Sequence, residues 1–336
     1  MIRVGMIGYG YWGPNLARNF LQVPGLHLQR VADLNESRRD AAQLACFGAE
    51  VTADATSVTH APDIDAVAIA TPAASHFELA LAALQNGKHV LVEKPLAHSV
   101  RQCERLIEEA AKRNLVLMVD HTFVYTDAVR WIRDFVAAGR LGQTYYFDSI
   151  RSNLGLFQRD VSVLWDLAPH DLSILTSVLG REPRSVTAVG ACHAGSRVPN
   201  IAHMTLDLEN DCLAHFHVNW LSPVKVRRIM IAGSERMVVF DDLDSSEKVK
   251  VYDSGVSIQH EDISGQHRML VQYRTGDMTS PALGNREALR TELEHFRDCV
   301  SGNLKPMTDG ESGLAVVRIL EAAEQSLERD GARVYL

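Results

Sequence analysis

The chain has 336 residues, of which 46% are hydrophobic and 23% are charged, and its formal net charge is −8. This length is comfortable for two domains, and the composition is typical of a soluble globular protein. The negative charge gives no electrostatic reason to expect nucleic acid or an anionic membrane as a partner. No apolar run approaches the ~18 residues of a membrane span, and the N-terminus begins directly with a strand pattern. We therefore expect a cytoplasmic protein.

A glycine-rich turn follows the first predicted strand. Residues 2–7 form a short apolar run, after which Gly8, Gly10 and Gly13 stand in the order G-x-G-x-x-G before a helical pattern. The first glycine permits a tight turn, the second lets the backbone approach a pyrophosphate, and the third lets the helix pack closely on the strand. The N-terminus of that helix favours an anion. The pattern predicts a dinucleotide site, and its alternative is an ordinary strand-to-helix turn.

An acidic residue ends the second predicted strand. Asp33 follows a strand pattern with apolar Leu26, Leu28, Val31 and Ala32, and it lies 20 positions beyond Gly13. Such folds place the acid that binds the adenosine ribose at this position. A carboxylate accepts hydrogen bonds from ribose hydroxyls but repels a 2′-phosphate, which favours NAD over NADP. Arg38 and Arg39 leave NADP open, because they could meet a 2′-phosphate. Arg38 could instead stack on adenine, or both could be solvated.

Strand and helix patterns continue to alternate up to residue 121. Residues 77–86 read as a helix closed by Gly87, and Ser99 with Gln102 forms a capping box for another helix. Buried strands are predicted at residues 65–70, 89–93 and 115–119. Repeated units of this kind imply an α/β Rossmann domain with a doubly wound parallel sheet, which we place at residues 1–121.

The pattern changes in the remainder, residues 122–336. A helix at 127–138 is followed by half-exposed strands, the clearest of which turns Ala214, Phe216 and Val218 to one face. Further strands are predicted at 145–150, 185–189, 204–208, 228–232 and 237–240. We expect an α+β domain with a large, mostly antiparallel sheet, one face of which packs on helices. The other face is free to form a homo-oligomer, a dimer or a tetramer.

Two helices are predicted near the end of the chain. Leu289, Leu293 and Phe296 form part of one apolar stripe, and Thr308 with Glu311 is predicted to cap the last helix. The five cysteines are scattered and lack C-x-x-C spacing, so we interpret them as reduced thiols and predict no metal site. They are Cys46, Cys103, Cys192, Cys212 and Cys299.

A lysine lies at the carboxyl end of a predicted parallel strand, in the motif Glu93-Lys94-Pro95. Ligands of open α/β sheets bind outside these strand ends, so Lys94 is expected at the same edge as Gly10 and Thr71. The bond between Lys94 and Pro95 could be cis. The alternative is a loop lysine that pairs with Glu93.

Asp166 and His170 are four positions apart, which is one turn on the same face if the segment is helical. Pro169 would bend such a helix. A histidine is suited to taking a hydroxyl proton near neutral pH, and a carboxylate can orient it or hold a substrate hydroxyl. The alternative is a structural Asp–His pair.

Small residues follow the predicted strand 65–70. They would let a cofactor pass close to the backbone, so we expect NAD contacts at Thr71 and Pro72. His76, a few positions further on, is expected to cap or pack rather than to react.

These motifs together resemble the Gfo/Idh/MocA oxidoreductase family over essentially the whole chain. The residues that carry the resemblance are GYGYWG, Ala70-Thr71-Pro72 with His76, Glu93-Lys94-Pro95 and Asp166-x-x-x-His170. The stretches GYWGPNLARNF and SNLGLFQRDVSVLWDLAPHD resemble the branch that oxidises nucleotide sugars, in particular UDP-N-acetylglucosamine, at C3. Asp120 departs from the glycine that relatives usually carry before the position of His121.

The resemblance implies a role for each catalytic candidate. His170 would take the proton from the C3 hydroxyl while hydride passes to nicotinamide, Lys94 would stabilise the alkoxide, and Asp166 would hold a neighbouring hydroxyl. The expected NAD-binding residues are Gly8, Gly10, Tyr11, Trp12, Gly13, Asp33, Arg38, Thr71, Pro72, His76, Glu93 and Lys94. For the substrate we expect Asp166 and, around its diphosphate, Arg151, Arg159, Lys225, Arg227 and Arg274. Lys225 and Arg227 share a strand face, although a solvated sheet edge is equally compatible with them.

The expected reaction is oxidation of UDP-N-acetylglucosamine to its 3-keto form for amino-sugar biosynthesis of the lipid A type. Four rivals stay open. They are a C3-ketoreductase of a deoxysugar nucleotide, an inositol or sugar dehydrogenase, an NAD-dependent glycosidase, and a sensor that binds NAD without turnover.

Overall fold

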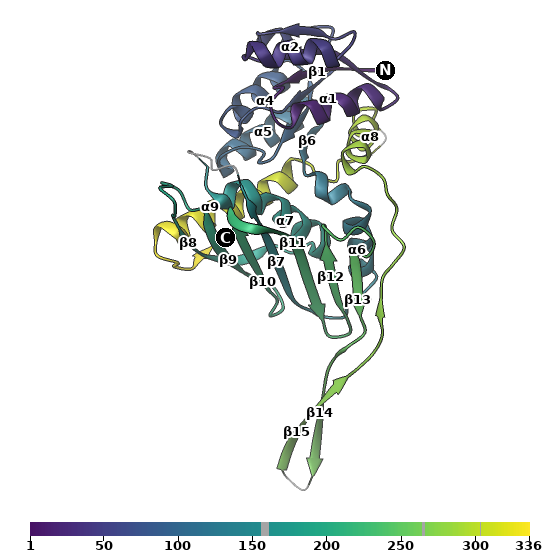
Figure 1. Cartoon of the computed structure of the whole chain (residues 1–336), viewed down its shortest axis with the longest axis vertical. Coiled ribbons are helices and arrows are strands. Elements are labelled where there is room, and N and C mark those ends of the chain that lie inside the picture. Colours follow the sequence, from purple (N-terminus) through teal and green to yellow (C-terminus); the bar gives the residue numbers. More distant parts are fainter. Residues whose placement is uncertain (156–160, 264–265, 303) are drawn as a thin grey trace. The chain divides into compact units, whose positions relative to one another are not determined.

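The computed structural model describes residues 1–155, 161–263, 266–302 and 304–336, with the backbone alone at 257–263 and 266–272 (Figure 1). The chain forms two compact units. Unit 1 comprises Met1–Thr126 and Arg286–Glu321, and unit 2 comprises Asp127–Asn285 and Ala322–Leu336. No helix within the described ranges is both long and apolar enough to cross a membrane.

Unit 1 is built on a six-stranded sheet in the order β3-β2-β1-β4-β5-β6. Its strands are β1 (Ile2–Ile7), β2 (Leu26–Ala32), β3 (Glu50–Thr52), β4 (Ala66–Ile69), β5 (His89–Glu93) and β6 (Leu117–Asp120). All neighbours pair in parallel. The order changes direction beside β1, which is the arrangement of doubly wound dinucleotide-binding sheets and confirms the predicted fold class.

The helices of unit 1 alternate with its strands. They are α1 (Gly13–Gln22), α2 (Glu36–Ala45), α3 (Thr56–Thr59), α4 (His76–Gln85) and α5 (Val100–Arg113), with short 3₁₀ turns η1 (Ala73–Ser75) and η2 (Thr122–Tyr125). Helix α4 lies within one residue of its predicted bounds. The Ser99 side chain accepts a hydrogen bond from the Gln102 N–H at 3.2 Å, which confirms the predicted cap of α5. Gly87 has φ +75° and closes α4.

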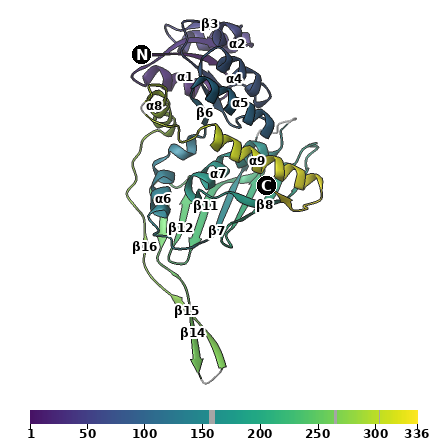
Figure 2. The same cartoon turned by 180° about the vertical axis from the view of Figure 1, so that it is seen from behind.

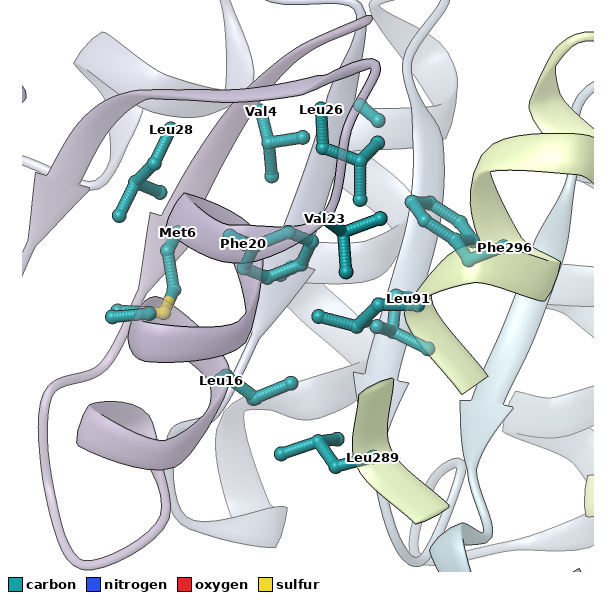
Figure 3. Packing of buried hydrophobic residues seen from close by; sticks show 14 of the residues in the cluster. Val4, Met6, Leu16, Phe20, Val23, Leu26, Leu28, Leu91, Leu289 and Phe296 are labelled. Atoms are coloured by element: carbon teal, nitrogen blue, oxygen red, sulfur yellow. The ribbon is translucent and has the colours of Figure 1, made fainter. Parts of the chain in front are cut away.

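Helix α8 (Ala288–Val300) belongs to unit 1 although it comes late in the chain. Figure 3 shows Leu289 and Phe296 of α8 in the same buried cluster as Leu16, Phe20 and Val23. The compact units therefore differ from the continuous segments 1–121 and 122–336 that the sequence predicted. The apolar stripe of α8 explains the difference, because it is buried against the first unit.

The last helix, α9 (Gly310–Glu328), is capped by a different residue from the one predicted. The Ser312 N–H donates to Asp309 Oδ1 at 2.9 Å, so Asp309 takes the capping role expected of Thr308. The Thr308 side chain is buried and lies 3.1 Å from the Tyr125 hydroxyl. The Thr308 carbonyl oxygen accepts a hydrogen bond from the Val119 N–H of β6. This bond holds the Thr308 backbone against the parallel sheet and so fixes the position of the residue.

Unit 2 is built on a nine-stranded sheet in the order β16-β13-β12-β11-β7-β10-β9-β8-β17. The strands are β7 (Thr144–Leu154), β8 (Pro183–Ala191), β9 (Ile201–Leu208), β10 (Leu213–Asn219), β11 (Leu221–Gly233), β12 (Met237–Asp241), β13 (Val249–Tyr252), β16 (Met278–Thr279) and β17 (Val334–Tyr335). Neighbours are antiparallel except β7 and β10. The sheet confirms the predicted α+β class, and Ala214, Phe216 and Val218 are buried as expected.

Helices α6 (Asp127–Ala137) and α7 (Val163–Leu179) pack together beside this sheet, as both views of the chain show (Figures 1 and 2). Helix α7 contacts β7, β9 and β10 and keeps Pro169 in its interior. Strands β14 (Gly255–Ile263) and β15 (Gln266–Arg274) form a separate antiparallel hairpin, which Figure 1 shows apart from the nine-stranded sheet.

Candidate active site

The glycine turn between β1 and α1 is fixed by close backbone contacts. Gly8 has φ +99°, and a Cβ added there would lie 2.5 Å from the Ala70 carbonyl oxygen. A Cβ on Gly13 would lie 2.6 Å from the Gly8 carbonyl oxygen. At Gly10 an added Cβ would meet only the Arg38 guanidinium, at 3.5 Å. The turn is therefore closed where it packs on the sheet and open at Gly10, as a pyrophosphate site requires.

Asp33 lies directly beside this turn. Its Oδ2 accepts from the Tyr9 N–H at 2.6 Å, and its Oδ1 accepts from the Asn35 N–H at 2.8 Å. Arg38 Nη1 lies 3.9 Å from Asp33 Oδ2, so both candidates for the adenosine end of NAD lie together. A carboxylate, an adjacent guanidinium and the N-terminus of α1 fit a dinucleotide. Arg39 instead donates to the carbonyl oxygens of Asp33 and Leu34, at 3.0 and 2.8 Å.

His76 holds two loops of unit 1 together. The buried imidazole lies between the Pro95 carbonyl oxygen, 2.8 Å from Nδ1, and the Thr71 carbonyl oxygen, 2.9 Å from Nε2. Burial lowers the pKa of the ring. Both nitrogens serve the loops that carry Thr71, Pro72 and Lys94, so the structure gives His76 the packing role that the sequence suggested.

Lys94 follows β5 at the carboxyl edge of the parallel sheet, and its bond to Pro95 is cis. The Lys94 backbone N–H donates to Glu93 Oε2 at 3.0 Å. Glu93 therefore contacts the lysine backbone, which fixes the carboxyl group beside the start of the Lys94-Pro95 turn.

Three carboxyl groups meet beside Lys94, a feature that the motifs did not predict. Glu93 and Asp120 are paired in register on β5 and β6. Asp120 Oδ2 accepts from the Trp12 indole N–H at 2.8 Å, and the Thr122 hydroxyl donates to Oδ1. Loss of solvent and the nearby Asp120 charge raise the pKa values of Glu93 and Glu292 well above their usual range. Both glutamates therefore favour the protonated form.

His121 lies next to this cluster and is also buried. Neither ring nitrogen has a hydrogen-bond partner within the described part of the chain. Burial lowers the pKa of the imidazole to about 4, with Lys94 acting in the same direction and Asp120 opposing it. The ring is therefore neutral near pH 7. The only sequence signal for this region was the replacement of a usual glycine by Asp120.

In unit 2, Asp166 and His170 both lie on α7, one helical turn apart and half-buried. This confirms the predicted helical placement despite Pro169. Asp166 Oδ2 accepts from the indole N–H of buried Trp220 at 3.1 Å. Trp220 therefore orients the carboxylate, a role that the sequence did not predict.

The basic residues proposed for the substrate are dispersed over unit 2. Arg151 is buried and bidentate with Asp171, with Nε–Oδ2 and Nη2–Oδ1 distances of 3.0 and 2.6 Å. Arg227 is opposite Arg151 in register but contacts Asp242, with a distance of 3.1 Å between Nη1 and Oδ2. Arg151 is therefore committed to an internal ion pair rather than to an open anion site.

The remaining basic candidates occupy different surroundings. Lys225 is exposed on β11, and Arg274 lies 3.3 Å from Glu235 and 3.4 Å from Asp253. Arg159 lies outside the described residues. Across the described ranges, no group of three or more histidine, cysteine, aspartate or glutamate side chains is arranged to hold a metal ion.

Two family models match the chain. One is described as the oxidoreductase family with an NAD-binding Rossmann fold and matches residues 2–121. The other is described as the GFO/IDH/MocA C-terminal domain and matches residues 129–239.

Individual relatives are similar over nearly the whole length. UDP-N-acetylglucosamine 3-dehydrogenase of Acidithiobacillus ferrooxidans is 29% identical, with 98% of this chain and 99% of the relative covered. A solved structure of that enzyme, GnnA, has a TM-score of 0.81 at 26% identity and 98% coverage of both chains. The scyllo-inositol 2-dehydrogenase (NADP(+)) IolW of Bacillus subtilis is 25% identical over 97% of this chain and 93% of its own.

Proposed function

Because the chain belongs to the Gfo/Idh/MocA oxidoreductase family and has its NAD-binding Rossmann domain, we propose that it oxidises the C3 hydroxyl of a nucleotide sugar. The proposed substrate is UDP-N-acetylglucosamine and the product is its 3-keto form. The observation that carries this proposal is full-length similarity to a UDP-N-acetylglucosamine 3-dehydrogenase. The presence of Lys94, Asp166 and His170 in this chain supports it.

In the proposed reaction, side chains of the protein accept the proton of the hydroxyl and stabilise the negative charge on its oxygen. NAD, when bound, accepts the hydride from C3. The His170 imidazole removes the proton of the C3 hydroxyl, so that the hydroxyl oxygen becomes the carbonyl oxygen of the product. The Lys94 ammonium stabilises the negative charge that develops on this oxygen. Asp166, oriented by Trp220, accepts a hydrogen bond from a neighbouring sugar hydroxyl.

We extend the proposal to the setting of the enzyme. The 3-keto sugar is suited to an aminotransferase, and we assign the reaction to cytoplasmic amino-sugar synthesis of the lipid A type. The sheet of unit 2 is proposed to join copies of the chain into a dimer or tetramer. Lys225, Arg227 and Arg274 remain candidates for the substrate diphosphate, and Arg159 is a candidate from sequence alone.

The direct test follows NADH absorbance with the purified protein and a panel of alcohols. The panel contains UDP-N-acetylglucosamine, UDP-glucose, free N-acetylglucosamine and myo-inositol. We expect turnover that requires both the UDP group and the sugar C3 hydroxyl, with a 3-keto product identified by mass. Turnover with myo-inositol but with neither UDP-sugar would keep the family assignment and remove the proposed substrate.

A second candidate function is that of a polyol dehydrogenase. It is supported by the similarity to an NADP(+)-dependent scyllo-inositol dehydrogenase. Running the panel with NADP as well as NAD separates the two, since Asp33 is expected to disfavour NADP. Assays in the reductive direction with a 3-keto deoxysugar nucleotide test the ketoreductase. Release of free hexosamine without net NADH would indicate the glycosidase.

A further inference from the structure

Glu292 on α8 presents an unusual buried carboxyl group. The residue is fully buried, and neither carboxyl oxygen has a donor within the described residues. An ionised carboxylate in such a place would have no cation beside it, and the nearby Thr122 hydroxyl already donates to Asp120, so ionisation is strongly unfavourable. The neighbouring groups are Asp120, Glu93, Thr122 and Tyr125. None of these supplies a cation.

A proton on Glu292 removes this difficulty. A neutral carboxyl is a donor as well as an acceptor, and it can donate to the Asp120 carboxylate beside it. Asp120 then accepts from three directions, since Trp12 and Thr122 also donate to it. Lys94 and His121 are the other titratable groups near Asp120 and Glu93. The arrangement makes Asp120 a shared acceptor between α8 and the glycine turn.

The hydrogen bond from Trp12 to Asp120 links the carboxyl cluster to the glycine turn. Trp12 is the residue at the N-terminal end of α1, and its carbonyl oxygen accepts from the Asn15 and Leu16 N–H groups at 2.9 and 3.3 Å. The indole is anchored on Asp120, so the first turn of α1 is held from both sides. A helix N-terminus of this kind binds the pyrophosphate of a dinucleotide.

We propose that Glu292 is a positioning residue for NAD: its protonated carboxyl donates to Asp120, which holds Trp12 and thereby sets the N-terminus of α1 for the pyrophosphate. The inference depends on NAD binding and is independent of the sugar. Glu292 is far from the glycine turn in sequence and lies in no NAD-binding motif.

The test is titration calorimetry of NAD, without sugar, against the full chain and four variants. Glu292→Gln retains a neutral donor and should bind NAD within about twofold of the parent. Glu292→Leu and Trp12→Phe each remove one link and should weaken NAD about tenfold, as loss of one hydrogen bond to a charged group would. The double variant Glu292→Leu/Trp12→Phe should be no more than about twofold weaker than either single one, because both act through Asp120.

The matched control is Glu294→Leu, which makes the same change two positions along α8 at a partly exposed residue; its NAD affinity should not change. Equal weakening in Glu292→Gln and Glu292→Leu would overturn the proposal. A double variant weakened about a hundredfold would do the same, because independent effects multiply. If Glu292→Leu does not fold, Glu292→Gln and Glu292→Gln/Trp12→Phe decide, since the latter must bind NAD as Trp12→Phe alone does.

Discussion

Two buried aspartates show how differently the two units accommodate negative charge. In unit 2, Asp171 receives the Arg151 guanidinium and the Ser149 hydroxyl, so a full cation neutralises it. In unit 1, Asp120 receives neutral donors from Trp12 and Thr122 and lies against two acids. An ion pair with a cation is insensitive to pH near neutrality, whereas glutamates whose pKa values are raised by burial respond to pH. The comparison predicts which substitutions and which changes of pH affect each unit.

The largest expected effect is a loss of turnover without a loss of NAD affinity. His170→Ala should lower kcat by about 10²–10⁴-fold, because it removes the proposed general base of unit 2. NAD affinity, which depends on unit 1, should change by less than about twofold. Steady-state kinetics and NAD titration measure the two quantities. Equal losses in turnover and in NAD affinity would instead assign His170 a role in folding.

The next prediction concerns the cation-paired aspartate. Arg151→Met should lower the free energy of unfolding by about 3–5 kcal/mol, because it leaves Asp171 buried without its partner. Arg3→Met is the matched control. Arg3 and Asp65 form a bidentate pair with the same two distances, 3.0 and 2.6 Å, but their side chains are 43% and 36% exposed. Urea unfolding should show only a small loss there. If both variants lost a similar amount of unfolding free energy, burial of the ion pair would not explain the effect of Arg151→Met.

A smaller effect is expected at the adenosine end of unit 1. Asp33→Asn retains an acceptor for the Tyr9 N–H but removes the charge that repels a 2′-phosphate. The ratio of NADP affinity to NAD affinity should rise about tenfold or more, as one charge-assisted interaction is lost and one repulsion removed. Arg38→Ala in the same background is the control and should reverse part of the gain, because Arg38 lies beside Asp33. An unchanged ratio would show that Asp33 does not select the cofactor.

The smallest effect, counted per pH unit, concerns the pH dependence of stability that Glu292 gives to unit 1. The pKa of Glu292 is raised by folding, so the folded protein binds this proton more tightly than the unfolded chain. Its contribution to stability is complete below the ordinary pKa near 4.5 and is lost as pH rises toward the folded-state pKa. Relative to the parent, Glu292→Gln should therefore gain about 1 kcal/mol for each pH unit above about 5. Parallel stability–pH curves would show that Glu292 is ionised.

The sequence predicted the parts of the fold that local patterns determine. Most neighbouring strands of the parallel sheet are consecutive in the chain, and the carboxyl ends of parallel strands lie at one edge, so the glycine turn, Asp33 and Lys94 could be placed there. The helical spacing of Asp166 and His170 was equally local. By contrast, the apolar stripe at Leu289 and Phe296 predicts that α8 is buried, but not in which unit.

The electrostatic features of the site were harder to predict, because they depend on partners that are distant in sequence. Arg151 alone looks like an anion ligand, and only the fold reveals that Asp171 neutralises it. Glu292 looks like an ordinary helix residue until α8 brings it to Asp120. Asp120 was noticed as a departure from glycine, yet its indole donor, Trp12, was assigned only to the glycine turn.

The discontinuity of unit 1 has a consequence for the order in which the protein matures. Residues 286–321 leave the ribosome after all of Asp127–Asn285, so the nucleotide-binding unit begins first but is completed only after this long insertion has been synthesised. Until α8 arrives, the nascent Rossmann sheet lacks the apolar stripe that covers Phe20 and Val23. A translating chain therefore exposes this patch while residues 127–285 are being synthesised, which gives chaperones time to bind there.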